Sequence, residues 1–269
     1  MSLLKKIETD IIPKEKINIF SLGQSGYIVK TNNSIIYIDP YLTDFIQNSD
    51  GLNEKDMSRL FHPPINPKEI NKIDAVLCTH SHADHMDPWT LNYINQDYKL
   101  ICTENAYRNN LFEIKIKNKL FIDLNDVITI KDFRITVLPA AHYKLSGLDG
   151  NPDCISFIIE AFGKKLFFWG DGIIYEGLID ELNNHKFDLF FAPINGRDWF
   201  REKKGIIGNL SSRELVELCN EINLDLVIPN HFDLFKYNSE FVEHFYNYIH
   251  KFNPSQSFKI LKPGDSLTI

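Results

Sequence analysis

The sequence predicts an α/β (α+β) fold in one compact domain over residues 1–269. Short β-branched and aromatic runs bounded by turn residues recur along the chain and predict strands. Capped and amphipathic segments between the later runs predict helices. Polar residues with metal-binding side chains follow several of the apolar runs directly. With 43% hydrophobic and 13% aromatic residues, the chain can bury a sizeable core.

Composition excludes several classes of protein. The formal charge of −7 comes from interspersed acids and bases without a basic stripe, so nucleic acid is not the expected substrate. No apolar run approaches the ~20 residues of a membrane span, and residues 1–10 do not resemble a signal peptide, so we expect a soluble cytoplasmic protein. The cysteines form no Cys-x-x-Cys pair and are expected to be reduced core residues; they are Cys78, Cys102, Cys154 and Cys219.

The chain opens with a predicted antiparallel meander. Its strands lie at 17–20, 26–30 and 34–38, with turns between them. The third strand ends at Asp39, whose carboxylate could hydrogen-bond a metal-bound histidine. A simple strand-ending Asp-Pro turn explains this residue equally well.

A long irregular segment follows at about 41–70. Loops of that length are often lids or binding loops, so we expect it near the active site. Whether it closes over a ligand or packs against another subunit stays open. His62 within it is either a substrate contact or a surface residue.

The remaining elements alternate between strands and helices. Asp87 and Pro88 supply the N-cap and first residue of a helix at 89–94, and Ser211 and Glu214 have the spacing of a capping box. Further helices are expected at 105–113 and 239–250. Strands are expected at 75–78, 100–102, 120–123, 127–130, 133–138, 154–161, 166–169, 187–192, 226–229 and 258–261.

The segment that follows the strand at 75–78 carries His80, His82, Asp84 and His85. Neutral imidazole and carboxylate hold divalent hydrolytic metals while leaving a position for water. Strand alternation places His80 and His82 on one side, and the residues after the turn can face a second metal. A lone histidine would more often be an ordinary polar residue, but this density predicts a metal site.

Three more candidates stand just past predicted strands. His142 follows the strand at 133–138, and His231 follows the strand at 226–229. Asp171 lies between two glycines, which let other backbone approach closely and suit a ligand that bridges two metals. Strand ends that converge on one edge are how sheet-based enzymes assemble their sites.

The segment from His80 to His85 resembles the His-x-His-x-Asp-His motif of the metallo-β-lactamase superfamily. The resemblance covers nearly the whole chain and implies a four-layer αββα sandwich of two mixed sheets. It also implies which residues bind metal: His80, His82 and His142 the first ion, Asp84, His85 and His231 the second, with Asp171 bridging.

Within that superfamily, segments 73–77, 195–197 and 227–231 are most similar to the L-ascorbate-6-phosphate lactonase group. This implies a metal-dependent hydrolase that opens a lactone of a phosphorylated sugar acid by metal-activated hydroxide, with Asp84 passing a proton. A phosphodiesterase acting on a small or lipid phosphoester is the alternative. Flavodiiron oxidoreductases resemble the fold too, but they carry Glu at the position of His82 and need a flavin domain.

Asn195 and Arg197 are the candidates for binding the substrate phosphate. Arg201, Lys203 and Lys204 follow in a stretch that resembles a loop and also fits a solvated charge run. For the cofactor we expect one or two divalent metals, Mn²⁺ ahead of Zn²⁺, because carboxylate sharing and the family likeness outweigh the zinc preference of histidine. The expected partner is a small, phosphorylated substrate, and assembly into a homo-oligomer stays open.

Overall fold

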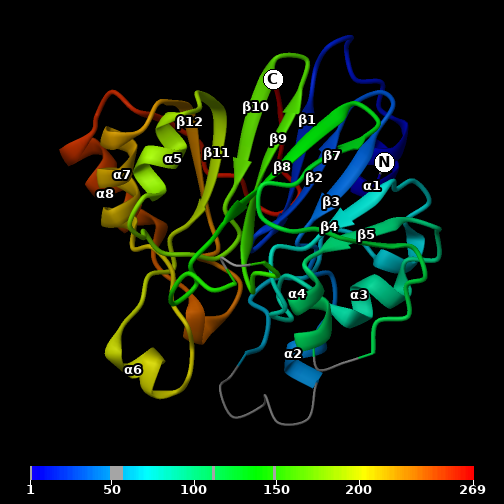
Figure 1. The fold of residues 1–269 in the computed structure, drawn as a ribbon, viewed down its shortest axis with the longest axis horizontal. Coiled ribbons are helices and arrows are strands. Elements are labelled where there is room, and N and C mark those ends of the chain that lie inside the picture. Colours follow the sequence, from blue (N-terminus) through cyan, green and yellow to red (C-terminus); the bar gives the residue numbers. More distant parts are fainter. Residues whose placement is uncertain (1, 49–56, 111–112, 148–149) are drawn as a thin grey trace.

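The computed structural model describes residues 2–48, 57–110, 113–147 and 150–269. Two seven-stranded mixed sheets face each other, and helices cover the outer side of each sheet (Figure 1). This arrangement is the αββα sandwich, so the predicted fold class is confirmed.

The first sheet has the strand order β14-β1-β2-β3-β4-β5-β6. Neighbours from β14 to β3 are antiparallel, which confirms the predicted meander, and neighbours from β3 to β6 are parallel. The strands are β1 (Asn18–Gly23), β2 (Gly26–Lys30), β3 (Ile35–Ile38), β4 (Ala75–Leu77), β5 (Lys99–Cys102), β6 (Lys119–Phe121) and β14 (Ser266–Thr268).

The second sheet has the order β13-β12-β11-β10-β9-β8-β7. Like the first sheet, it changes from antiparallel to parallel neighbours. Neighbours from β7 to β10 are antiparallel, and those from β10 to β13 are parallel. Parallel neighbours need crossover connections, which here contain helices. The strands are β7 (Val127–Ile130), β8 (Phe133–Pro139), β9 (Ile155–Ala161), β10 (Lys164–Phe168), β11 (Phe187–Pro193), β12 (Leu224–Asn230) and β13 (Ser257–Phe258).

Apolar side chains fill all three spaces between the layers. Between the sheets, the ring of Phe191 stacks on Phe168 at 4.2 Å and meets the edge of Tyr27 at 4.6 Å. Outside the first sheet lie α1 (Leu3–Thr9), α3 (Pro88–Tyr93) and α4 (Glu104–Asn109). Outside the second lie α5 (Leu178–Asn183), α7 (Ser212–Glu221) and α8 (Val242–Phe252). No helix of the described residues is both long and apolar enough to cross a membrane.

Several element boundaries differ from the prediction. Local patterns in the sequence do not predict α1, α5 or β14, and α6 (Trp199–Lys203) occurs where a loop is expected. α4 ends earlier than predicted, and residues 111–112 of that predicted helix lie outside the described residues. These helices have at most seven residues, too few for a periodic apolar pattern.

The predicted loop at 41–70 contains the short helix α2 (Phe45–Asn48), which packs against Leu234 and Phe235 after β12. The side chain of Arg59 is buried and donates hydrogen bonds to three carbonyls of the same loop. Residues 49–56 of this loop lie outside the described part of the chain.

Candidate metal centre

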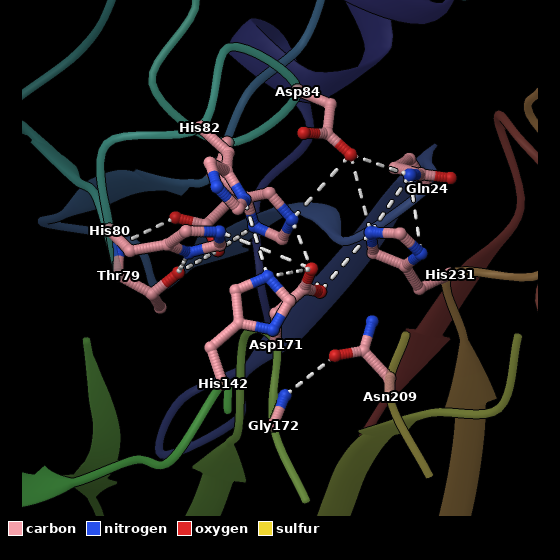
Figure 2. A network of polar contacts seen from close by, with 12 residues as sticks. Gln24, Thr79, His80, His82, Asp84, His142, Asp171, Gly172, Asn209 and His231 are labelled. Atoms are coloured by element: carbon pink, nitrogen blue, oxygen red, sulfur yellow. Dashed lines mark hydrogen bonds and ion pairs between the residues drawn. The ribbon is translucent and has the colours of Figure 1, made fainter. Parts of the chain in front are cut away.

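The seven predicted metal ligands lie close together, where strands of both sheets end. Figure 2 labels all of them except His85. The segment with His80 and His85 follows β4 of the first sheet. His142, Asp171 and His231 follow β8, β10 and β12 of the second sheet. His80 and His231, which are 151 positions apart in the sequence, therefore belong to one site because both sheets end at the same edge.

His80, His82, His142 and Asp171 form the first group of side chains. Nε2 of His142 lies 3.2 Å from Nδ1 of His82 and 3.3 Å from Oδ2 of Asp171. Nε2 of His80 lies 4.0 Å from the same Oδ2 atom. The distances suit atoms that surround one cation.

Asp84, His85 and His231 form the second group. Oδ2 of Asp84 lies 3.2 Å from Nε2 of His231 and 3.7 Å from Nε2 of His85. Oδ1 of Asp171 approaches the same two nitrogens, at 3.1 Å and 3.2 Å. One oxygen of Asp171 thus faces each group, the arrangement of a bridging carboxylate.

The donor atoms fit a pair of divalent cations. Nε2 of His80, Nε2 of His85 and Oδ1 of Asp171 are buried without a hydrogen-bond partner among the described residues. Buried polar atoms of this kind are costly unless something else satisfies them. Imidazole and carboxylate donors converging on one point are the ligand set of zinc and related metals.

Two of the imidazoles are held in the neutral form that binds metal. Burial lowers the pKa of His142 to about 4. Burial and then the neighbouring His85 and His82 hold the pKa of His80 well below its usual value. Both side chains therefore present a lone pair at neutral pH.

Asp39 and Thr79 orient one histidine of each group. Oδ2 of Asp39 lies 2.8 Å from Nδ1 of His85 and accepts a 2.7 Å hydrogen bond from Oγ1 of Thr79. Oγ1 of Thr79 is also 3.0 Å from Nδ1 of His80. Outer hydrogen bonds of this type fix the ring orientation of metal-binding histidines. The position of Asp39 at a strand end predicts such a role, whereas Thr79 carries no comparable signal in the sequence, although it stands beside His80.

The two glycines around Asp171 admit close neighbours. Gly170 has φ +72°, and a Cβ atom there would lie 2.6 Å from Oγ1 of Thr79. A Cβ atom on Gly172 would overlap the indole of Trp169. The turn can therefore lie against Thr79 only because Gly170 lacks a side chain, and against the indole of Trp169 only because Gly172 lacks one.

Gln24 is a member of the site that sequence reasoning assigned only to a turn. Its Nε2 donates a 2.8 Å hydrogen bond to Oδ2 of Asp84 and lies 2.9 Å from Nε2 of His231. The side chain is buried in the turn between β1 and β2. A glutamine in a turn carries no sequence signal for such a position.

Asn195 and Arg197 have partners within the protein. Asn195 is fully buried, donates to Oδ1 of Asn238 at 2.8 Å and accepts from Nδ2 of Asn209 at 2.9 Å. The guanidinium of Arg197 pairs with Glu214 at 2.5 Å and donates to the carbonyl of Asn209 at 2.9 Å. Substrate binding by either residue stays a prediction.

The other basic residues of this region are also engaged. Arg201 is bound to Asp198 and to the carbonyl of Asn195. Lys203 lies 5.4 Å from the ring centre of Trp199, and Lys204 packs similarly on another aromatic ring. His62, the candidate from the long loop, is exposed.

Two cavities open beside the metal centre, and both are lined by His82, His142 and Ile207. The first has a volume of about 280 Å³ and a polar wall that includes Lys144. The second has a volume of about 190 Å³ and an apolar wall of Ile46, Met57, Ile206 and Ile207. Ile46 and Met57 belong to the 41–70 loop, so part of that loop borders the site.

A family model described as "Beta-lactamase superfamily domain" matches residues 35–232. The chain belongs to this superfamily. The match includes every residue of both ligand groups.

Individual relatives share low sequence identity with this chain. A protein named "UPF0173 metal-dependent hydrolase" from Caldivirga maquilingensis is 24% identical, with 92% of this chain and 96% of that protein aligned. "Probable L-ascorbate-6-phosphate lactonase UlaG" from Shigella boydii is 24% identical, with 64% of this chain and 53% of that protein aligned. The chain thus matches about half the length of the lactonase.

Among solved structures, the metallo-β-lactamase fold protein YhfI from Bacillus subtilis superposes with a TM-score of 0.66. The superposition covers 95% of this chain and all of that chain at 16% identity. This likeness shows the shared fold.

Proposed function

We propose that the protein opens the lactone ring of a phosphorylated sugar acid, such as L-ascorbate 6-phosphate, by hydrolysis at a centre with two divalent metals. At the coarser level, the chain is a metal-dependent hydrolase of the metallo-β-lactamase superfamily. The observation that carries the proposal is the pair of ligand groups that share the carboxylate of Asp171. The choice of a lactone is supported by the similarity to the lactonase.

The chemistry assigns a role to Asp84. A bound divalent metal supplies an acidified water, with a pKa lowered from ~15.7 towards ~7, and polarises the carbonyl under attack. Asp84 belongs to the second ligand group and lines the apolar cavity, so a substrate bound in that cavity would lie beside its carboxylate. We assign to it the transfer of a proton to the leaving alkoxide. For the metal we propose Mn²⁺ ahead of Zn²⁺.

We assign the phosphate of the substrate to the polar cavity, with Lys144 as its cation. Lys144 lines this cavity beside His82 and His142 and forms no ion pair with any described residue. The guanidinium of Arg197 is already neutralised by Glu214. An unpaired ammonium group is the better partner for an incoming phosphate, because it loses no existing ion pair.

The test is ring opening of L-ascorbate 6-phosphate by protein reconstituted with Mn²⁺. We expect turnover in the wild type, none in His82→Ala, and a roughly tenfold higher KM in Lys144→Met, equivalent to about 1.4 kcal/mol of binding. Lys117→Met, which removes an exposed lysine away from both cavities, is the matched control. An absence of ring opening by protein with two bound metals would reject the lactone.

The apolar cavity favours a second candidate function. Ile46, Met57 and Ile206 could receive an alkyl or aryl group, which a sugar phosphate lacks. A phosphodiesterase acting on a small or lipid phosphoester would use the same metal centre. Hydrolysis of bis(p-nitrophenyl) phosphate without lactone opening would select this function, and lactone opening alone would reject it.

A further inference from the structure

Gln24 occupies an unusual place for a glutamine. It lies in the turn between β1 and β2, just after the register shift between Ser21 and Gly23, and its φ is +55°. This left-handed conformation is unfavourable for a residue with a long side chain. The side chain is also buried, at 4% exposure, although a turn residue normally points into solvent. Strain together with a buried polar group indicates a residue kept for a specific contact.

Gln24 contacts two members of the second ligand group, Asp84 and His231 (Figure 2). Its side-chain amide donates to Oδ2 of Asp84 at 2.8 Å, and Nε2 lies 2.9 Å from Nε2 of His231. The backbone carbonyl oxygen of Gln24 accepts a 3.2 Å hydrogen bond from the backbone N–H of His231. The turn therefore packs directly on the second group.

The orientation of the amide follows from its neighbours. Rotating the amide by 180° would bring Oε1 against the carboxylate of Asp84, where two acceptors would repel each other. With the amino group facing inward, Oε1 is buried without a hydrogen-bond partner among the described residues. The contact with Asp84 therefore outweighs the cost of that unsatisfied oxygen.

Asp84 needs such a partner more than the other ligands do. It stands on the turn after His82, is 14% exposed, accepts a hydrogen bond from Gln24, and otherwise lies against the imidazoles of its own ligand group. A carboxylate oxygen has two lone pairs, so Oδ2 can accept from Gln24 and bind a cation together. His80 and His85, in contrast, are held by Thr79 and Asp39.

We infer that Gln24 is a positioning residue whose side-chain amino group fixes Oδ2 of Asp84 toward the second ligand group. It would thereby raise the affinity of the second metal site and leave that of the first unchanged. This inference rests on the metal centre of the proposed function but not on the choice of substrate. Metal binding can be measured without any substrate. A failure of this inference can therefore be told apart from a failure of the proposed function.

The experiment is a calorimetric titration of metal-free protein with Zn²⁺. We expect two bound ions in the wild type, and in Gln24→Met one site unchanged and the other weakened 10- to 100-fold. Gln24→Asn, whose short amide side chain suits the left-handed backbone but does not reach Asp84, should give the same result in a variant that keeps the fold. Gln256→Met is the matched control, because the side-chain amide of Gln256 also donates hydrogen bonds, to the carbonyls of Asp225 and Ser257, but lies on the surface after α8.

Gln24→Glu separates hydrogen-bond donation from metal coordination. A carboxylate cannot donate to Asp84, so the second site should stay weak. Recovery of wild-type affinity in this variant would overturn the proposed role, since it would show an oxygen at position 24 acting as a ligand. Wild-type affinities at both sites in Gln24→Met and Gln24→Asn, or equal losses at both sites, would also overturn it.

Discussion

Asp39 illustrates how a single residue outside the ligand groups can control the metal centre. Its carboxylate contacts Nδ1 of His85 at 2.8 Å and accepts from the backbone N–H of Thr79, also at 2.8 Å. Asp39→Asn keeps the shape and one acceptor but loses the negative charge that orients His85. We expect metal affinity to fall 10- to 100-fold in a Zn²⁺ titration, because outer partners of metal-bound histidines have effects of this size.

The exposed Asp97 supplies the control for this variant. Asp97→Asn removes the same charge away from the centre and should bind metal as the wild type does. Equal affinities in Asp39→Asn and the wild type would show that the ring of His85 is held by packing alone.

The single-residue view also shows what sequence could predict of the site. The candidate ligands could be selected from the sequence because His80, His82, Asp84 and His85 are crowded into one short segment, and because the other candidates follow apolar runs. Gln24 was not predictable, since its role depends on a turn of the first sheet lying against a strand end of the second. Likewise, Glu214 forms an ion pair with Arg197, although the two residues are 17 positions apart in the sequence. No local sequence pattern predicts such a pair.

At the scale of an element, the turn after β10 depends on the absence of a side chain at Gly170. The residue has φ +72°, and a Cβ atom would overlap the side chain of Thr79. We expect Gly170→Ala to destabilise the protein by about 3 kcal/mol, combining a left-handed backbone with overpacking. Urea unfolding followed by circular dichroism measures this difference.

Gly163 offers a matched control for the backbone part of that effect. Its φ is +74°, but a Cβ atom there would meet nothing within 4 Å. Gly163→Ala should therefore cost only about 1 kcal/mol. Equal losses in the two variants would contradict the argument that Thr79 needs the space beside Gly170.

The capping box of α7 gives an element-scale prediction that depends on pH. Burial alone would raise the pKa of Glu214, but the hydrogen bonds from Arg197 and Ser211 outweigh it and hold the pKa below the usual 4.5. The ionised carboxylate therefore stabilises the fold above pH 4.5, and this contribution is lost as the pH falls through the lowered value. Glu214→Gln should cost about 1 kcal/mol at pH 7, given that both partners are partly exposed, and little at strongly acidic pH.

The same helix contains the control for Glu214. Glu217 pairs with Arg213 at 3.5 Å on the exposed surface, so Glu217→Gln should change stability by less than about 0.5 kcal/mol at either pH. A constant loss in Glu214→Gln from pH 7 to acidic pH would show that shape, and not charge, supports the helix.

Elements with strong local signals were predicted well, and those stabilised mainly by packing were not. The capping box of α7 and the Asp87 cap of α3 stand in the structure where the sequence indicates them. By contrast, α1 buries just Leu4 and Ile7, and β14 is a strand of three residues at an edge of the first sheet. Both depend on contacts with a sheet formed by distant parts of the chain.

At the scale of the whole molecule, the metal centre joins the two sheets. The candidate ligands between His80 and His85 follow β4 of the first sheet, whereas His142, Asp171 and His231 follow strands of the second. Bound cations would link the sheets at this edge and would satisfy buried atoms that otherwise have no partner among the described residues. Stability should therefore depend on metal.

We expect removal of metal with EDTA to lower the melting temperature by about 5–10 °C, since a ligand at 100 times its Kd adds about 2.7 kcal/mol to a chain of this size. Added Mn²⁺ or Zn²⁺ should restore the lost stability, because binding to the folded state alone shifts the unfolding equilibrium. Asp171→Asn, which weakens the shared ligand of both groups, should melt at nearly the same temperature with and without EDTA. If metal analysis shows that the cations are removed and the wild type still melts unchanged, the two sheets must hold together at this edge through packing alone, and the centre then serves only the chemistry.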